Sequence, residues 1–217
     1  MATAPLHLAG PRFRIRDATP DDAPAMTDCF FRSFNAPFWQ YFIPDNKGDR
    51  KWWTDAWIMG LENPTDRSFV AEDTENGNKI VAFSRWMLPQ SDGNLERKWP
   101  DLPDSWDMEV AGAFFGGMEA NRKAMMGTRP HWFLEMLGVH EDYQKHGIAA
   151  RLIKWGTDQA DKDGLDTYLD GSEVGQPYYK RRHAFTKDEK DVDIPDRPQY
   201  GSFHYKSLVR GPQPVSV

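Results

Sequence analysis

The sequence predicts an α/β domain in which helices flank a mixed sheet. Three observations lead to this prediction. Apolar runs of strand length alternate with segments of helical periodicity along the 217 residues. The Asn76-Gly77 pair lies between two such runs and indicates a β-hairpin. Residues 131–161 combine an apolar strand, a short polar turn and an amphipathic helix.

The composition is that of a folded globular protein. Hydrophobic residues make up 39% and aromatic residues 13% of the chain, so a sizeable core can be buried, and the length fits one large domain. We expect a flexible leader over residues 1–11, a single domain over 12–210 with an insertion at about 89–126, and a tail over 211–217.

Charge and cysteine content exclude several classes of function. The net charge of −6 gives no electrostatic reason to expect nucleic acid or an anionic membrane as a partner. One cysteine, Cys29, rules out an internal disulfide and a cysteine-based metal site, which fits a reducing compartment. The chain has no apolar stretch of the roughly 18 residues that a membrane span needs. It shows no signal peptide, so we expect a cytoplasmic protein. We also expect no metal site.

In the first half of the chain the pattern changes element by element. A first strand is expected in 12–19, where apolar and basic residues alternate, and Thr19 then caps a helix that ends near Ser33. Further along, the patterns predict a loop or short helix over 36–45, a helix over 49–61, strands over 68–73 and 79–88, an inserted loop over 89–107 and a helix over 108–126.

In the second half, a strand over 131–139 leads through the turn into a helix from Ile148. A short strand over 165–172 follows, then a brief helix and a further strand within 173–185. Residues 186–198 are highly charged and are interpreted as a solvated loop, and 200–209 alternate as a last strand.

The turn between the strand and the helix is a candidate anion site. Gly147 can adopt a positive φ and lets the backbone approach a phosphate without a Cβ clash. The N–H groups from Lys145 to Ala149 then meet the positive end of the helix dipole. Gln144 can fix the turn, and Lys145 and Arg151 can add positive charge. The alternative is an ordinary strand-to-helix connection that contains a glycine.

The residues of this turn resemble the acetyl-CoA signature of the GNAT superfamily of N-acetyltransferases. That signature reads Gln/Arg-x-x-Gly-x-Gly/Ala, and Gln144, Gly147 and Ala149 match its three defining positions. Val139 matches the usual valine at the end of the preceding strand. The resemblance covers about residues 131–180 and suggests a fungal-type member with an unknown small-molecule substrate.

The resemblance implies a fold, a co-substrate and a set of binding residues. The fold would be a mixed, mostly antiparallel central sheet flanked by helices, with acetyl-CoA at the central strand, turn and helix. Backbone groups near Leu137 and Val139 would pair with the pantetheine arm, and an amide there would polarise the thioester carbonyl. Gly138 is consistent with a bulge or a close ligand approach. The residues implied in acetyl-CoA binding are Leu137, Val139, Gln144, Lys145, His146, Gly147, Ile148 and Ala149.

An attacking amine must lose a proton, so a general base is expected. Glu135 is the lone acid in the apolar strand, and some members of the superfamily carry their base at that position. We expect burial to raise the pKa of Glu135 toward a useful range. The alternative is a glutamate that faces solvent or pairs with a lysine or arginine. His131 and Glu109 are weaker candidates.

The leaving thiolate needs a proton donor, for which the resemblance implies a tyrosine. Gly175 and Tyr179 align with the family's Gly-x-x-apolar-Tyr helix, so Tyr179 is the expected general acid, and Tyr178 is its alternative after a one-residue shift. A packing tyrosine is the structural alternative. The family's Gly-Phe pair after the tyrosine is absent here, because the chain continues as residues 180–185, KRRHAF.

These residues predict direct acetyl transfer from acetyl-CoA to an amine. The Phe- and Trp-rich segments 30–42 and 51–59 fit an aromatic or apolar small molecule, unless most of these rings belong to the core. Cys29 lies on no recognisable nucleophile turn, which argues against a covalent intermediate. The alternatives are a CoA-binding regulatory protein without turnover and an O- or other acyltransferase. A homodimer is left open.

Overall fold

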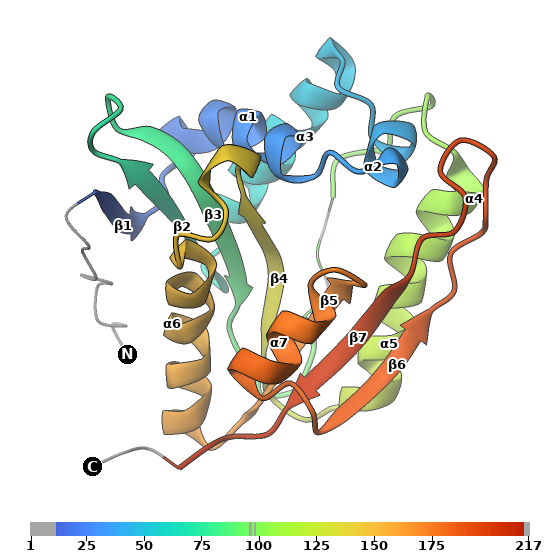
Figure 1. Cartoon of the computed structure of the whole chain (residues 1–217). Coiled ribbons are helices and arrows are strands. Elements are labelled where there is room, and N and C mark those ends of the chain that lie inside the picture. The colour runs from blue at the N-terminus through green and yellow to red at the C-terminus, as the bar shows by residue number, and fades with distance from the viewer. Residues whose placement is uncertain (1–11, 96, 98, 215–217) are drawn as a thin grey trace.

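The computed structural model describes residues 12–95, 97 and 99–214. The predicted leader over 1–11 lies outside these residues, as do 215–217 of the predicted tail. The described strands form one sheet (Figure 1). They are β1 (Phe13–Asp17), β2 (Asp66–Asp73), β3 (Lys79–Met87), β4 (His131–Val139), β5 (Asp166–Ser172), β6 (Asp188–Val192) and β7 (Tyr205–Arg210).

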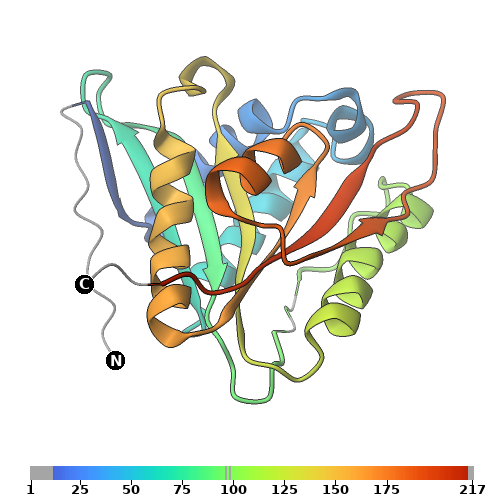
Figure 2. The same cartoon turned by 60° about the horizontal axis from the view of Figure 1, so that its bottom comes forward.

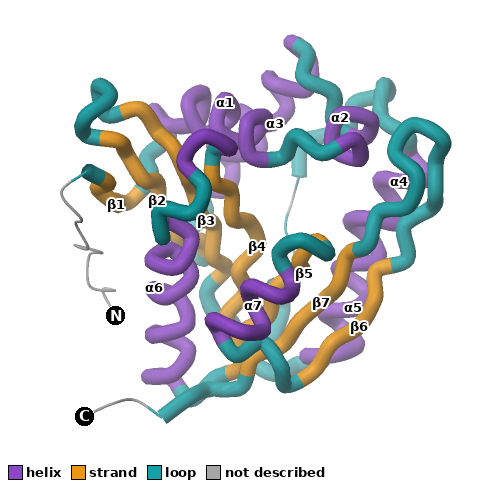
Figure 3. Tube along the Cα trace, viewed as in Figure 1, coloured by secondary structure: helices purple, strands orange, loops and turns teal. Residues whose placement is uncertain are grey.

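Helices lie on both faces of the sheet (Figure 3). They are α1 (Ala23–Ser33), α2 (Pro37–Phe42), α3 (Lys47–Leu61), α4 (Met108–Ala111), α5 (Gly117–Met126), α6 (Ile148–Asp163) and α7 (Gln176–His183). Short 3₁₀ turns cover Pro20–Asp22 and Glu141–Tyr143, and a π-helical segment, Gly112–Gly116, joins α4 to α5. None of these helices combines the length and apolar composition that crossing a bilayer requires.

The strand order is β1-β2-β3-β4-β5-β7-β6. Within the described part of the chain, only β4 and β5 run parallel, so the sheet is mixed and mostly antiparallel as predicted. The pairing of β4 with β5 begins at His131 and Asp166 and ends at Leu134 and Leu169. Beyond that point the two strands diverge toward their C-terminal ends (Figure 1). We call this divergence the β4–β5 fork.

Two apolar clusters hold the helices to the sheet. On one face, α6 and α7 cover the strands (Figure 2), and Leu134, Leu169 and Leu152 belong to the cluster beneath them. On the opposite face, α1, α2 and α3 bury aromatic residues such as Trp57 against Phe83 of β3. The helix α5 lies on this second face, where the Tyr168 hydroxyl contacts the Met118 carbonyl oxygen. The fork therefore lies between two layers of helices.

Three local features differ from the sequence prediction or refine it. The further strand predicted within 173–185 is not found there; the next strand is Asp188–Val192, which forms β6 at the sheet edge and pairs with β7, so the prediction of a solvated loop over 186–198 is wrong for these residues. The aromatic segment at 36–45 contains the helix α2 rather than only a loop. The predicted helix over 108–126 is interrupted by the glycine-rich π-helical segment Gly112–Gly116.

Candidate active site

The turn before α6 has the backbone conformation of an anion-binding nest. Lys145 has a φ of 66° and Gly147 a φ of 75°, so two left-handed residues stand two positions apart. Gly147 caps α6 without a side-chain hydrogen bond to the first helical N–H groups. Residues 144–147 are exposed, and a Cβ on Gly147 would meet no atom within 4 Å. Open space and helix N–H groups thus meet at one point.

Two side chains of this turn contact neighbouring strands. Gln144 donates from Nε2 to the Val139 carbonyl oxygen at 3.4 Å, which ties the turn to the end of β4. The His146 ring lies 5.6 Å from the Phe13 ring, measured between centroids. Ile148, the first residue of α6, is buried, whereas Ala149 is half-buried. The predicted turn residues 144–149 are therefore together at the start of α6.

The fork lies next to this turn and offers an unpaired strand edge. Leu137 and Val139 are half-buried and pair with Ser84 and Ala82 of β3. On the other edge, the described residues of β4 beyond Leu134 have no strand partner, because β5 has diverged. Backbone groups on such an edge are available to an extended ligand.

The bulge in β4 lies at Glu135 rather than at Gly138. Arg85 pairs with Met136 while Trp86 pairs with Leu134, so Glu135 is the extra residue. Gly138 is required for another reason, since a Cβ there would lie 2.4 Å from Cζ of the buried Phe83. Glycine at this position therefore allows a phenylalanine ring, rather than a ligand, to approach the strand.

Glu135 belongs to a buried ionic cluster. Its Oε2 accepts a hydrogen bond from Nε of Arg85 at 2.5 Å, and its Oε1 accepts one from Nε of Arg97. Arg97 also pairs with Asp66. The guanidinium carbon of Arg85 lies 4.7 Å from the Trp57 ring centroid and 5.2 Å from that of Trp99. Glu135, Arg85, Arg97 and Asp66 thus form a four-residue cluster walled by aromatic rings.

The expected upward shift of the Glu135 pKa is wrong. Burial does raise it, but the charges and hydrogen bonds of Arg85 and Arg97 outweigh burial and hold the pKa of Glu135 below its usual range. Both carboxylate oxygens already accept charged donors. The structure thus gives Glu135 the ion-paired environment that the sequence offered only as an alternative.

Tyr179 lies on α7 against the backbone of β5. A Cβ on Gly171 would lie 3.1 Å from Cε2 of Tyr179 and one on Gly175 3.0 Å from the same atom, so both glycines make room for this ring. Burial raises the pKa of Tyr179 to about 12 and also raises that of the adjacent Tyr178. The Tyr179 hydroxyl therefore stays protonated near neutral pH and can donate a hydrogen bond.

Asp170 is a residue that the sequence prediction missed. It lies on β5, where burial raises its pKa to about 7 against the lowering effect of two hydroxyl donors, Ser207 and Tyr168. Ser207 Oγ donates to Asp170 Oδ1 at 2.7 Å and the Tyr168 hydroxyl donates to the same oxygen at 3.0 Å. The sequence signal is weaker here than for Glu135, because residues 165–172 are mixed in polarity and contain a second acid, Asp166.

The weaker base candidates have structural partners. His131 is buried, and its Nδ1 lies 2.7 Å from the Arg129 carbonyl oxygen. Burial lowers the pKa of His131, so the ring is neutral at pH 7. Glu109, on α4, pairs with Arg197 at 2.6 Å.

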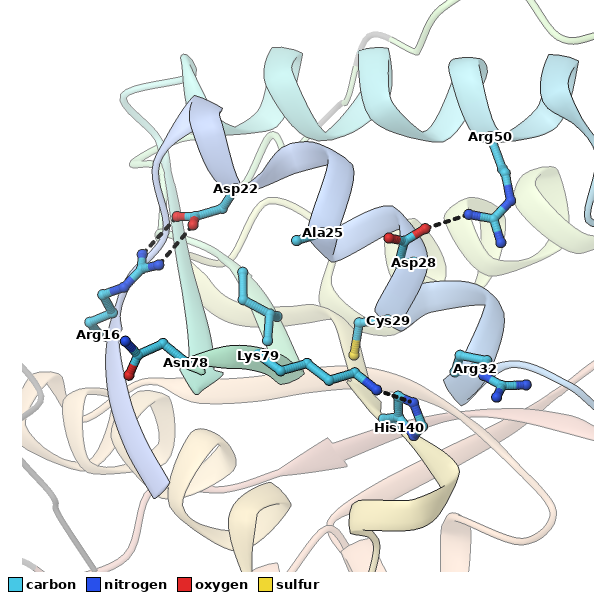
Figure 4. A pocket seen from close by; sticks show the side chains of 11 residues that line it. Arg16, Asp22, Ala25, Asp28, Cys29, Arg32, Arg50, Asn78, Lys79 and His140 are labelled. Atoms are coloured by element: carbon cyan, nitrogen blue, oxygen red, sulfur yellow. Dashed lines mark hydrogen bonds and ion pairs between the residues drawn. The ribbon is translucent and has the colours of Figure 1, made fainter. Parts of the chain in front are cut away.

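A cavity of about 500 Å³ lies beside α1, next to the end of β4 but on the face opposite α6 (Figure 4). Lys79 Nζ approaches His140 Nε2 to 3.1 Å at its wall. Cys29 also lines the cavity, and burial raises the pKa of its thiol to about 11. A thiol that stays protonated is a poor nucleophile, in agreement with the expectation that Cys29 forms no acyl intermediate.

Most rings of the Phe- and Trp-rich segments belong to the core. Phe30 stacks on Trp53 with centroids 4.0 Å apart, and both side chains are buried. Phe38 stacks on Phe203 at 3.8 Å. The structural alternative given for these segments therefore holds for the larger share of their rings. Phe34 and Tyr41 are half-buried.

The chain was compared with protein families and with solved structures. A model described as the acetyltransferase (GNAT) family matches residues 25–185. A solved acetyltransferase from Corynebacterium glutamicum, described as histone acetyltransferase HPA2 and related acetyltransferase, is 17% identical. The match covers 95% of this chain and 99% of that one, with a TM-score of 0.56.

Two further solved structures share the fold. Mosquito arylalkylamine N-acetyltransferase like 5b is 14% identical, with 92% of this chain and 99% of that chain covered and a TM-score of 0.57. Arabidopsis thaliana NAA60 in complex with acetyl-CoA is 14% identical, with 92% and 98% covered and a TM-score of 0.53. The fungal-type resemblance stays a prediction.

Proposed function

Because the chain belongs to the GNAT acetyltransferase family, whose members transfer acetyl groups from acetyl-CoA, we propose that it acetylates an amine by direct transfer. One observation carries this proposal. The exposed left-handed turn at Lys145 and Gly147 lies at the open end of the β4–β5 fork, so an anion site adjoins an unpaired strand edge. A long ligand with a pyrophosphate at one end and an amide-containing arm at the other fits that pair of features.

In this proposal the N–H groups of residues 145–149 bind the pyrophosphate of acetyl-CoA, and Gln144 holds the turn in place. The pantetheine arm pairs with the free edge of β4 near Leu137 and Val139. A β4 amide at the fork polarises the thioester carbonyl and stabilises the oxyanion that forms on attack. The reaction uses no metal.

The proposed role of Tyr179 is to stabilise the leaving thiolate by hydrogen bonding. A thiol with a pKa near that of cysteine, about 8.5, is a stronger acid than a tyrosine whose pKa is about 12. Complete proton transfer from Tyr179 to the thiolate is therefore uphill, whereas donation of a hydrogen bond is not. Tyr178 is the alternative donor.

The catalytic role of Glu135 stays a prediction. Its carboxylate could accept a proton only by giving up part of its interaction with Arg85 or Arg97. Glu135→Gln distinguishes a base from a structural anion when its turnover and its thermal stability are measured together.

The acceptor is proposed to be a small amine with an aromatic or apolar body. The name of the mosquito protein, arylalkylamine N-acetyltransferase like 5b, supports testing this class first. The predicted cytoplasmic location stays a prediction, as does a homodimer, which light scattering after size-exclusion chromatography measures.

The test is release of free thiol from acetyl-CoA in the presence of 2-phenylethylamine, hexylamine, a lysine peptide or an alcohol of matched size. Thiol release that depends on an amine supports the proposal. CoA binding without thiol release for any acceptor indicates a regulatory protein instead. Release with the alcohol alone indicates an O-acyltransferase.

A pair of glycine variants tests the anion site directly. Gly147→Glu places bulk and negative charge at the turn, so CoA binding measured by calorimetry should be lost. Gly164 is the matched control, because it ends the same helix with a φ of 66° and its Cβ position is equally open. Gly164→Glu introduces the same side chain with the same backbone strain and should leave CoA binding within a few-fold of wild type. Equal CoA affinity in both variants contradicts the site.

A further inference from the structure

Two carboxylates are the first residues beyond the β4–β5 fork, one on each strand. Glu135 follows Leu134, the last residue of β4 that pairs with β5. Asp170 follows Leu169, the last residue of β5 that pairs with β4. Their surroundings differ, since Glu135 is held by two guanidinium groups and Asp170 by two neutral hydroxyl groups. Both oxygens of Glu135 accept a hydrogen bond, whereas the two donors to Asp170 share a single oxygen.

The hydroxyl groups hold Asp170 by one oxygen and leave the other available. Ser207 and Tyr168 both donate to Oδ1. Asn121 Nδ2 in turn donates to Ser207 Oγ at 3.2 Å and fixes that hydroxyl. Oδ2 has no hydrogen-bond partner among the described residues. The carboxylate is therefore oriented by β5, β7 and α5 while one oxygen can accept a proton.

Asp170 faces the side of the sheet away from α6. Along β5, Leu169 packs in the cluster beneath α6 and α7, so its neighbours Tyr168 and Asp170 point to the opposite face. Tyr168 confirms this direction, because its hydroxyl contacts Met118 of α5. In the proposed function acetyl-CoA binds at the start of α6, so an acceptor that approaches from the other face of the sheet would reach Asp170 at the fork.

The charged and titratable groups that act on Asp170 come from three elements. Tyr168 lies on β5 itself, and Arg122 of α5 lowers the pKa of Asp170 through its charge. Tyr205 of β7 is close enough for Asp170 to raise its pKa. Burial is the largest effect and leaves the pKa of Asp170 at about 7. A carboxylate with this pKa matches a proton acceptor that works near neutral pH.

We propose that Asp170 is the base that takes the proton from the acceptor amine at the β4–β5 fork, a role that rests on the proposed function. The neutral amine nitrogen attacks the thioester carbon, the new C–N bond forms and the C–S bond breaks. One N–H proton passes to the Asp170 carboxylate. The thiolate leaves with a hydrogen bond from Tyr179 and gains its proton from water, and Asp170 then releases its proton to water. The products are the amide and free CoA thiol.

The test compares Asp170→Asn with wild type in the thiol-release assay, using whichever amine of the panel gives the highest rate. General-base catalysis is worth roughly 10²- to 10⁴-fold, so kcat of Asp170→Asn should fall by about that factor while CoA affinity stays within a few-fold. The wild-type rate should rise with pH through about 7. Protonation of the amine substrate changes the rate of wild type and of Asp170→Asn equally, so it cancels in the ratio of the two rates. The pH dependence of that ratio therefore reports the enzyme group that titrates near pH 7.

Ser207→Ala provides a readout that a purely structural role would not move. Loss of this donor destabilises the ionised carboxylate, so the pKa of Asp170 should rise and the acid limb of the rate profile should shift to higher pH. Asp188→Asn on β6 is the control, because Asp188 is exposed on the edge strand and β7 separates it from β5, and it should leave the rate and the limb unchanged.

The outcomes separate the two proposals. Full activity and an unchanged pH limb in Asp170→Asn overturn the role of Asp170 while acetyl transfer stands. An unshifted limb in folded Ser207→Ala also overturns it. A wild-type enzyme that binds CoA but releases no thiol with any amine overturns the proposed function, and the role of Asp170 falls with it.

Discussion

The buried cluster of Glu135, Arg85, Arg97 and Asp66 predicts a large stability loss for Glu135→Gln. The four side chains are between 0% and 9% exposed, and their charges sum to zero. The variant leaves two guanidinium groups with one carboxylate. Removing one partner of a buried ion pair costs about 3–5 kcal/mol, and the glutamine oxygen still accepts a hydrogen bond, so we expect about 3 kcal/mol.

For a chain of 217 residues this loss corresponds to a Tm about 6–12 °C lower, measured by calorimetry. The matched control is Glu189→Gln on β6, where a glutamate that is 44% exposed pairs with Lys180 and Lys206. That surface site should lose less than about 1 kcal/mol. A Tm of Glu135→Gln within about 1 °C of wild type refutes the structural reasoning, and lost turnover at that unchanged Tm supports Glu135, in place of Asp170, as the base. Turnover near wild type per folded molecule contradicts the base.

Two further predictions concern packing and pH. Gly156→Ala on α6 should destabilise the protein by about 1–2 kcal/mol in denaturant titrations. The new Cβ would lie 2.4 Å from Cζ2 of the buried Trp86, and this overpacking outweighs the ~1 kcal/mol gain in helix propensity. A variant more stable than wild type contradicts the clash. Asp170 has a folded pKa of about 7, above its unfolded value of 3.8, so the stability it contributes at low pH is lost as pH rises through 7. Denaturant midpoints should therefore show that Asp170→Asn is stabilised relative to wild type at pH 8 and less so at pH 5, and a difference independent of pH contradicts the shifted pKa.

The strand, turn and helix around residues 131–161 could be predicted because their signals are local. The apolar run of β4, the helical periodicity of α6 and the single Gly147 all lie within one short segment. The hairpin of β2 and β3 was predicted on the same basis, although its left-handed residues are Gly77 and Asn78 rather than Asn76 and Gly77. Backbone requirements that depend only on neighbouring residues can therefore be predicted from the sequence.

The environment of each acid could not be predicted, because its partners are distant in sequence. Glu135 contacts Arg85 from 50 residues away and Arg97 from 38 residues away. Asp170 accepts a hydrogen bond from Ser207, which lies 37 residues away in the sequence. Whether burial or a cation decides a pKa depends on these contacts, so the sequence located an acid in β4 but assigned its pKa the wrong direction. The exposed strand β6 was not predicted for a related reason. Its residues are mostly charged and show no strand pattern of their own, and they are held in the sheet by pairing with β7.

The short contact between β4 and β5 has a consequence for how the protein opens. Four residue pairs join β1–β4 to β5–β7, and side-chain stacking such as that of Phe38 on Phe203 supplements them. Both parts share the apolar cluster beneath α6 and α7, which holds Leu134 of β4 together with Leu169 of β5 and Leu208 of β7. The two strands can therefore separate locally at the fork, by loss of a short ladder, while this cluster stays packed. A ligand that spans the fork restrains both strands, so acetyl-CoA should slow hydrogen exchange at the C-terminal ends of β4 and β5 more than at β1 or β6.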